Sequence, residues 1–191
     1  MKWFPRYNYI LASKSPRRQE LLQLLGIKFK IQTKEVKEKY TENLSKEEIP
    51  VFLARLKAEP FLKDLKKNDL LITADTIVWF HNQVLGKPAN KKEAILMLEQ
   101  LSGQKHFVIS GVCLSSCNKQ KTFYAISEVQ FKNLTGEEIE FYVSEYNPID
   151  KAGSYGIQEW IGIIGITHIE GSFYNVMGLP IQKLYEEIQK F

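Results

Sequence analysis

The chain has 191 residues, of which 44% are hydrophobic and 25% charged, and its formal net charge is +4. This length suits one sizeable core and is too short for several independent domains, so we expect a single domain over residues 1–191. The composition is that of an ordinary globular protein, which argues against disorder. Lysines alternate with acidic residues along 34–48 and 63–69. Such mixed runs are typical of solvated surface, so the charge does not favour a nucleic-acid-binding protein.

The cysteines and the N-terminal segment limit the redox and membrane classes. Cys113 and Cys117 stand in an apolar stretch without CxxC spacing or nearby histidines, a pattern that argues against a zinc site or a disulfide scaffold. We therefore expect reduced thiols in a cytoplasmic protein. The segment MKWFPRYNYI lacks the apolar core of a signal peptide, and no run approaches the ~18 apolar residues that span a bilayer. No membrane role is predicted.

The first predicted unit is a short strand, a tight loop and a helix. Ser15 suits the N-cap of this helix, Pro16 its first position, and Gly26 its end. Arg17 and Arg18 then stand in the first turn, at the positive end of the helix dipole. That end suits a bound anion, which would give the two arginines a function. The alternative is that both are solvated surface residues.

Hydrophobic periodicity, helix-capping residues and prolines predict the next elements. Residues 29–33 alternate like a strand, and Ser45 with Glu48 resembles the capping box of a helix that Pro60 should end or kink. Residues 69–80 are rich in β-branched and aromatic side chains, which predicts a buried strand at the centre of the sheet.

The second half of the chain is also predicted to contain both helices and strands. Asn90 and Glu93 predict a helix that ends at Gly103, and Thr135 with Glu138 predicts another. The remaining expected elements are a hairpin over 106–131, an ordered functional loop over 147–158, one or two strands within 161–171, and a terminal helix from Pro180. This order of helices and strands favours a mixed α/β sheet.

Asp75 is the most informative single residue, because it interrupts the apolar strand LLITADTIVWF. An ionised carboxylate in a buried strand is costly unless it is paired, hydrogen-bonded or bound to a metal. The site is therefore either a functional cleft or a structural salt bridge. Thr76 should point to the other face of a regular strand.

Several charged side chains elsewhere can serve the same chemistry. Lys87 lies in a rigid setting between Gly86 and Pro88, and Lys57 stands on the helix before Pro60. Most such lysines extend to solvent. Basic groups bind phosphate, and carboxylates supply the hard oxygen ligands that Mg²⁺ or Mn²⁺ prefer. The candidate set is Arg17, Arg18, Lys57, Lys87, Glu38 and Asp75.

Other catalytic signatures are missing from the sequence. There is no GxSxG elbow, Walker A loop or GxGxxG fingerprint, which argues against acyl hydrolases, P-loop NTPases and dinucleotide oxidoreductases. The histidines His81, His106 and His168 are isolated from one another, so structural roles are expected for them.

Six motifs in order resemble those of the Maf family of nucleoside triphosphate pyrophosphatases. They are LASKSPRRQELL, ADTIV, LGKP, LSG, DKAGSYGIQ and IEGSFYNVMGLP, and they span nearly the whole chain. The resemblance implies an elongated α/β fold like that of inosine triphosphatase, in which a mixed sheet flanked by helices forms two lobes around a deep nucleotide-binding cleft. It also implies hydrolysis of a nucleoside triphosphate to the monophosphate and pyrophosphate with a divalent metal, and a homodimer.

The resemblance assigns roles to particular residues. The ADT motif of this sequence is similar to that of the family branch that prefers dTTP and UTP. Glu38 matches the metal-binding acid of the family, and the nearby Glu35 is an alternative for that role. The resemblance implies that Asp75 activates the water that attacks the α-phosphorus. The implied sets are Asp75, Lys87 and Lys57 for catalysis, Ser13, Arg17, Arg18, Thr76 and Gln158 for substrate binding, and Glu38 and Asp75 for the metal.

Three alternatives remain open at this point. The first is a pyrophosphatase for modified nucleotides, such as a methylated pyrimidine or 7-methyl-GTP. The second is a nucleotide-binding regulator without turnover. The third is a nucleic-acid-binding module, which would show a steep salt dependence and no requirement for Asp75.

Overall fold

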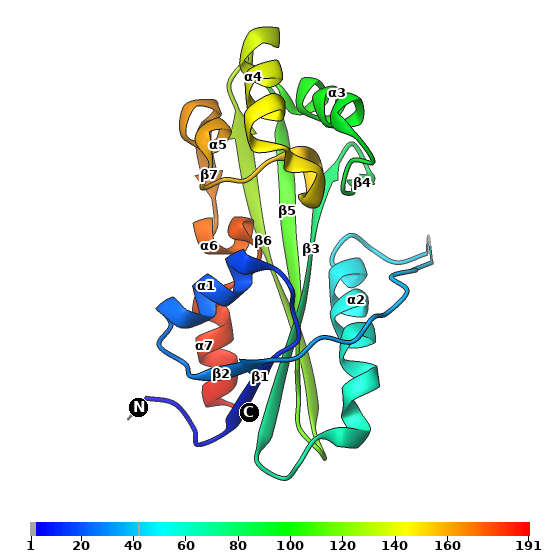
Figure 1. Ribbon diagram of the computed structural model, residues 1–191, viewed down its shortest axis with the longest axis vertical. Helices are drawn as coiled ribbons and strands as arrows, with labels where there is room; N and C mark the ends of the chain where they lie inside the picture. The colour runs from blue at the N-terminus through cyan, green and yellow to red at the C-terminus, as the bar shows by residue number, and fades with distance from the viewer. Residues whose placement is uncertain (1–2, 42) are drawn as a thin grey trace. The chain divides into compact units, whose positions relative to one another are not determined.

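The computed structural model describes residues 3–41 and 43–191, and Figure 1 shows its helices and strands. The chain folds into two compact units, each assembled from segments that lie far apart in the sequence. Unit 1 comprises the described residues up to Thr76 with Ser110–Ala125 and Gly178–Phe191, and unit 2 comprises Ile77–Ile109 and Ile126–Met177. The expected single domain and the expected cleft stay predictions.

The strands form a mixed sheet. They are β1 (Asn8–Leu11), β2 (Phe29–Ile31), β3 (Asp69–Phe80), β4 (Gln83–Leu85), β5 (Lys105–Ser115), β6 (Gln120–Phe131) and β7 (Ile166–Glu170). Their order is β2-β1-β3-β5-β6-β7, with β4 paired to β3. β1 is parallel to β2 and β3, whereas β4 and β7 are antiparallel to their partners. The predicted mixed α/β sheet is confirmed, and β3 is an interior strand as its apolar sequence predicts.

The α-helices are α1 (Pro16–Leu24), α2 (Glu48–Ala58), α3 (Lys91–Leu101), α4 (Gly136–Tyr146), α5 (Trp160–Gly165), α6 (Phe173–Met177) and α7 (Ile181–Gln189). Short 3₁₀ helices accompany them, namely η1 (Glu59–Asp64), η2 (Pro148–Asp150) and η3 (Ala152–Ser154). Within the described ranges, no helix combines the length and the apolar character that a membrane crossing needs.

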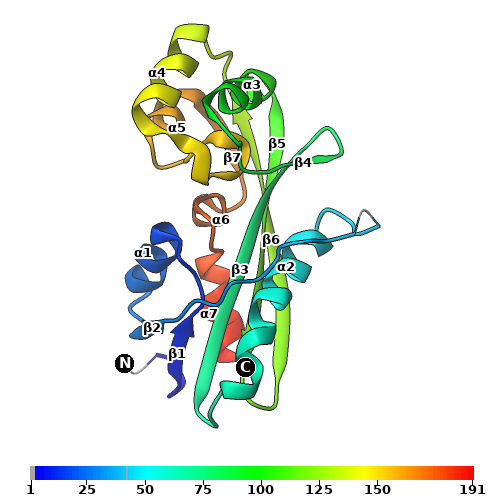
Figure 2. The same cartoon turned by 45° about the vertical axis from the view of Figure 1, so that its right-hand side comes forward.

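Unit 1 has helices on both faces of its strands. Ala54 of α2 and Phe61 of η1 pack with Ile10, Leu71 and Cys113, which β1, β3 and β5 contribute to a buried apolar cluster. On the other face lie α1 and α7, as Figures 1 and 2 show from two directions. Side chains of β3 that alternate in direction therefore face α2 on one side and α1 on the other.

Local signals locate most helix ends correctly. Asn90 accepts a hydrogen bond from the Glu93 N–H at the start of α3, and Thr135 and Glu138 form a complete capping box at α4. Pro60 follows the last residues of α2, and the chain continues as the tighter helix η1. These predictions are confirmed because each depends only on neighbouring residues.

Two local predictions are confirmed, with details that the sequence did not reveal. Ser15 is the N-cap residue of α1, but it makes no side-chain capping bond, and its own N–H donates to Ser13 Oγ at 3.2 Å. One strand, β7, lies within 161–171, and the residues before it form helix α5. Gly162 lets α5 close against the preceding loop, since a Cβ there would stand 2.0 Å from the Ile157 carbonyl oxygen. That close approach is a tertiary contact that periodicity does not reveal.

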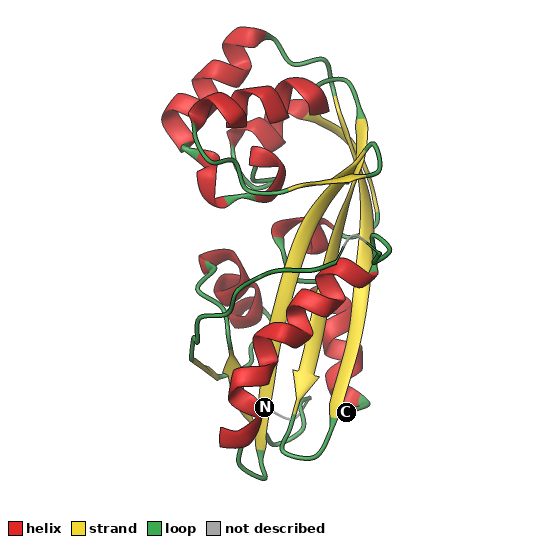
Figure 3. Cartoon of the chain, turned by 90° about the vertical axis from the view of Figure 1, so that its right-hand side faces the viewer, coloured by secondary structure: helices red, strands yellow, loops and turns green. Residues whose placement is uncertain are grey.

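Unit 2 gathers its helices on one side of its strands, as Figure 3 shows. His106 lies in the core of this unit with 1% of its surface exposed. Its Nε2 is 2.7 Å from the Tyr155 hydroxyl, and its ring stacks on Phe131. Its Nδ1 has no hydrogen-bond partner among the described residues, so the imidazole is held chiefly by apolar packing.

This environment predicts acid sensitivity. Burial lowers the pKa of His106 to about 3, from an ordinary value of 6.5. Between those values the unfolded chain binds a proton that the folded chain does not, so the free energy of unfolding falls as pH falls, by at most about 1.4 kcal/mol per pH unit. We expect His106→Gln to flatten this dependence between pH 6.5 and 4 in urea denaturation. His168→Gln, a change of an exposed ring, should leave the slope as in wild type. Equal slopes in wild type and His106→Gln would contradict the prediction.

Candidate active site

A cluster of three charged side chains lies on one face of β3 in unit 1. Asp75 projects from β3 with 8% of its surface exposed, and the Lys57 ammonium on α2 pairs with its carboxylate. The same ammonium lies 3.1 Å from Glu38 Oε1, on the loop after β2. Two carboxylates therefore converge on one cation. This arrangement explains how an ionised Asp75 is tolerated in an apolar strand.

The loop that carries Glu38 is attached near its start. The Lys34 ammonium donates to the Pro60 carbonyl at 2.7 Å, pairs with Asp64, and lies 4.9 Å from the centre of the Phe61 ring. Further along the loop, the Glu38 carboxylate forms an ion pair with Lys57. The loop is thus fixed to η1 at one point and to α2 at another.

The structure distinguishes the two acidic candidates of this loop. Glu38 reaches Lys57, whereas Glu35 lies 3.9 Å from Lys14 with a side chain that is 96% exposed. The sequence left this choice open because the two residues share one charged run. Only the attachment of the loop to η1 and α2 places Glu38, and not Glu35, beside Asp75.

Arg18 organises the opposite face of β3. Its Nε donates to the Gly178 carbonyl at 2.8 Å, one terminal nitrogen donates to the Ala74 carbonyl at 2.8 Å, and the other donates to Thr76 Oγ1 at 3.0 Å. Thr76 also lies 2.8 Å from the Ser110 hydroxyl of β5. As the strand alternation predicts, Asp75 and Thr76 face different neighbours. Arg18 therefore binds the backbone of the residue before Asp75 and the side chain of the residue after it.

The pKa of Arg18 reflects its burial and its charged neighbours. Burial lowers the pKa of its guanidinium, the neighbouring Arg17 lowers it further, and the Asp75 carboxylate opposes both effects. A guanidinium has five N–H groups, and three of them make the bonds just described. We expected Arg18 and Thr76 to bind substrate, and that role stays a prediction. What the structure adds is that they bind each other.

Ser110 is a member of this site that sequence reasoning missed. It is fully buried on β5, in an otherwise apolar run, and it contacts Thr76. A buried hydroxyl in a core strand needs a partner, so a serine within HFVISGVCL was the available signal. The sequence alone could not identify its partner, because Thr76 is on another strand.

The loop before α1 holds the remaining unit 1 candidates. Ser13 is buried and its Oγ accepts the Ser15 N–H, while the Gln19 amide donates to the Ser13 carbonyl at 3.2 Å. Arg17 is partly buried one turn further on. The structure brings Ser13, Arg17 and Arg18 to the N-terminal end of α1, where a helix favours an anion. Their binding of phosphate stays a prediction.

Unit 2 carries the other two candidates. Lys87 is exposed, and the Gly86 carbonyl beside it accepts the Gly153 N–H at 3.1 Å. This bond joins the LGKP segment to the loop that leads to Gln158. Gln158 is exposed although the seven residues before it are, with one exception, buried. Both side chains are thus available to a ligand of unit 2.

Glu38 and Asp75 are the carboxylates of this cluster that could bind a divalent cation. In the described part of the chain, no group of three or more histidine, cysteine or acidic side chains is placed to hold a metal. Glu38 and Asp75 nevertheless both reach one ammonium, so their oxygens surround a single cationic position. Mg²⁺ is commonly bound by one or two carboxylates together with waters and substrate phosphates. The donor set fits that mode of binding.

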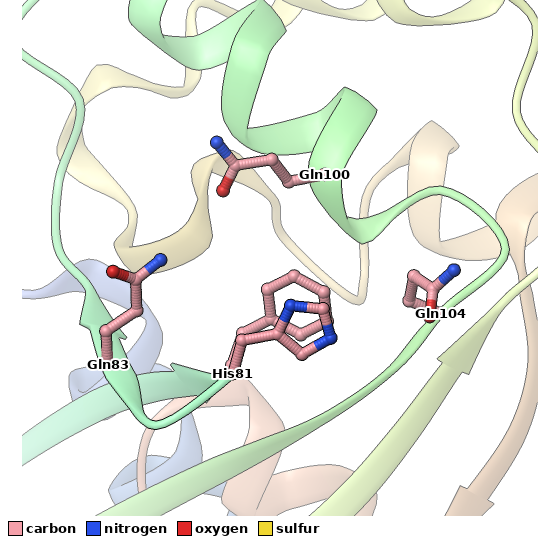
Figure 4. A pocket seen from close by; sticks show the side chains of 5 residues that line it. His81, Gln83, Gln100 and Gln104 are labelled. Atoms are coloured by element: carbon pink, nitrogen blue, oxygen red, sulfur yellow. The ribbon is translucent and has the colours of Figure 1, made fainter.

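A surface pocket of about 370 Å³ in unit 2 has a different character. Figure 4 shows His81, Gln83, Gln100 and Gln104 around it, and Phe80 also lines it. The His81 ring stacks on Phe80 with 3.9 Å between ring centres. Among the described residues, the lining contains no lysine, arginine or carboxylate. A triphosphate would find no charge complement there, and none of the predicted site residues lines this pocket.

Comparison with known proteins identifies the relatives of the chain. Residues 8–191 match the family model described as Maf-like protein. The dTTP/UTP pyrophosphatase of Phocaeicola vulgatus is 52% identical, with 97% of this chain and 96% of that protein covered. The protein of the same name from Flavobacterium psychrophilum is 49% identical, with 96% and 94% covered.

A solved structure confirms the fold class independently. The Staphylococcus aureus Ham1 protein is similar with a TM-score of 0.54 and 16% identity, and the match covers 96% of this chain and 98% of that one. At that identity the likeness speaks for the fold alone. The family model and the relatives extend over nearly the entire sequence, and the chain belongs to the Maf family.

Proposed function

We propose that this protein hydrolyses nucleoside triphosphates, dTTP and UTP among them, to the nucleoside monophosphate and pyrophosphate. The observation that carries the proposal is the cluster of Asp75, Lys57 and Glu38, because it joins a base, a cation and a second acid at one point. The names of the relatives, dTTP/UTP pyrophosphatase, support both the reaction and the substrates.

The chemistry can be assigned to the side chains of unit 1. A carboxylate oxygen of Asp75 accepts a proton from water, and the water oxygen attacks the α-phosphorus. The bond from that phosphorus to the bridging oxygen breaks, and pyrophosphate leaves with the electron pair. Lys57 neutralises negative charge that develops on the phosphate oxygens. No covalent intermediate is required, so the protein supplies positioning and charge.

A divalent cation would be held by Glu38 and Asp75. When bound, it would supply positive charge to the phosphate oxygens and lower the cost of bringing a polyanion to two carboxylates. Lys87 belongs to the same proposal as a phosphate-binding residue. A cytoplasmic location and a homodimer are also proposed, from the free thiols Cys113 and Cys117 and from the family resemblance.

The direct test is pyrophosphate release by the purified protein across canonical and methylated nucleoside triphosphates. We expect release from dTTP and UTP with Mg²⁺ or Mn²⁺, and loss of at least about 90% of it with a chelator, since the cation balances the triphosphate charge. Release only from a modified purine would move the protein to another substrate class. Binding without release would favour the nucleotide-binding regulator and overturn the proposal.

A further inference from the structure

The loop that carries Glu38 has little regular structure of its own. Residues 32–41 form neither helix nor strand, and every residue among them except Val36 is exposed. The Gln32 N–H donates to the Leu11 carbonyl at 3.1 Å, and the chain leaves β1 after this bond. An exposed loop without a ladder of backbone hydrogen bonds is held in place only by particular contacts. The position of Glu38 therefore depends on the side chains that attach its loop.

Lys34 makes contacts of this kind with η1. Its ammonium donates to the Pro60 carbonyl, pairs with the Asp64 carboxylate and lies over the Phe61 ring. Phe61 is 3% exposed and belongs to the buried apolar cluster of unit 1. A lysine with three such partners is held more firmly than one in an isolated surface ion pair. Lys34 thus attaches an exposed loop to an element that is fixed in the core.

The attachment lies close to the acidic cluster along the chain. Helix α2 leads directly into η1, so Lys57 and the partners of Lys34 stand on one continuous run of helical backbone in unit 1. Glu38 follows Lys34 by four residues, a length of chain that spans at most about 14 Å. Fixing Lys34 on η1 therefore confines Glu38 to the neighbourhood of α2, where its carboxylate meets the Lys57 ammonium.

We propose that Lys34 is a positioning residue for Glu38, and that it thereby sets the affinity of Glu38 and Asp75 for a divalent cation. A carboxylate on a mobile loop is in place for only a fraction of the time, and the apparent dissociation constant rises as that fraction falls. Lys34 raises the fraction through its contacts with η1. The inference rests on the proposed function and deepens it.

The positive charge of Lys34 gives the test a clear sign. If Lys34 acted only through its charge, Lys34→Met would strengthen cation binding, because a repelling charge is removed. Its role in attaching the loop predicts the opposite. We expect the Kd for Mn²⁺ to rise about fivefold in Lys34→Met, the effect of losing one surface attachment. The measurement is a titration of the nucleotide-free protein with Mn²⁺, in which electron paramagnetic resonance reports free Mn²⁺.

A double-mutant cycle shows whether Lys34 acts through Glu38. Glu38→Gln should weaken Mn²⁺ binding at least as much as Lys34→Met, because it removes the carboxylate itself. The double variant should match Glu38→Gln alone. Lys34→Arg should restore wild-type binding, since a guanidinium can also bond to the carbonyl and the carboxylate and stack on Phe61.

Lys63→Met is the matched control. Lys63 is exposed on η1 beside Asp64, and it is not among the residues that bind Lys34 or Glu38. The change removes the same charge from the same region, and we expect a Kd for Mn²⁺ within about twofold of wild type, because solvent and salt screen exposed charges. Thermal unfolding checks that every variant is folded.

Pyrophosphate release gives a second measure of the same effect. The Mn²⁺ concentration for half-maximal release should rise in Lys34→Met by the factor found in the titration. At saturating Mn²⁺ its kcat should stay within about twofold of wild type, because the metal then holds Glu38 in place.

The outcomes separate the two levels of the proposal. If wild type releases no pyrophosphate from any nucleotide, the proposed function fails. If wild type is active but binds no Mn²⁺, or if Lys34→Met binds Mn²⁺ as tightly as wild type, the positioning role fails while hydrolysis stands. Effects of Lys34→Met and Glu38→Gln that add in the double variant would also overturn it, as would equal losses in Lys34→Met and Lys63→Met.

Discussion

Asp75→Asn should lower kcat by about 100-fold or more, because the amide cannot accept the proton of the attacking water. The fold should persist, since an asparagine side chain is nearly the same size as that of aspartate and Lys57 retains Glu38 as a partner. Steady-state pyrophosphate release at saturating nucleotide measures the loss. Thermal unfolding checks that the variant is folded.

Asp69→Asn provides the matched control for this change. Asp69 lies on the same strand with the same exposed fraction, 8%, but its carboxylate accepts from the Asn8 amide and the Lys66 N–H. We expect some loss of stability and a kcat within about twofold of wild type, because Asp69 is not part of the proton-transfer site. Near-normal turnover in Asp75→Asn, or equal losses in both variants, would refute the assigned base.

Gly111→Ala should have the largest effect on stability. Gly111 lies on β5 directly under the first turn of α2, and a Cβ there would stand 2.3 Å from the Pro50 carbonyl carbon and 2.4 Å from its oxygen. Backbone atoms cannot rotate away, so α2 must shift from the sheet at a cost of about 1–3 kcal/mol, typical of overpacking. Because α2 carries Lys57, kcat should fall as well. Urea denaturation and pyrophosphate release measure the two effects.

Gly136→Ala is the corresponding control for Gly111→Ala. Gly136 begins α4, and a Cβ added to it meets no atom within 4 Å. Its free energy of unfolding should stay within about 0.5 kcal/mol of wild type, as for other open surface positions. If the two variants are equally stable, α2 is not held against β5 as closely as described.

The sequence predicts those features of the fold that neighbouring residues determine. The apolar run of β3, the N-cap of α3 and the capping box of α4 each depend on residues at most a few positions apart. The strand predicted within 161–171 is β7, whereas helix α5 before it was not predicted, because its Ile and Gly residues fit either period and its helical form depends on close contact with Ile157. Such contacts between distant residues leave no periodic signal.

The same distinction applies to the candidate site. Asp75 could be selected from the sequence because a carboxylate conflicts with its apolar strand. Its pairing with Lys57 and the choice of Glu38 over Glu35 depend on how α2 and the loop after β2 pack. Ser110 was not predicted, since a buried hydroxyl has no functional meaning until its partner is known.

The placement of Asp75 and Thr76 on opposite faces of β3 bears on how such an enzyme can diversify. A change at Thr76 alters the surroundings of Arg18 and Ser110, but leaves the carboxylate that faces Lys57 in place. On the roles proposed for Thr76 and Asp75, substitution at Thr76 would change substrate binding and leave the group that activates water in place. An inserted or deleted residue in β3 would exchange the two faces, and would therefore move the contacts of Asp75 and those of Thr76 at once.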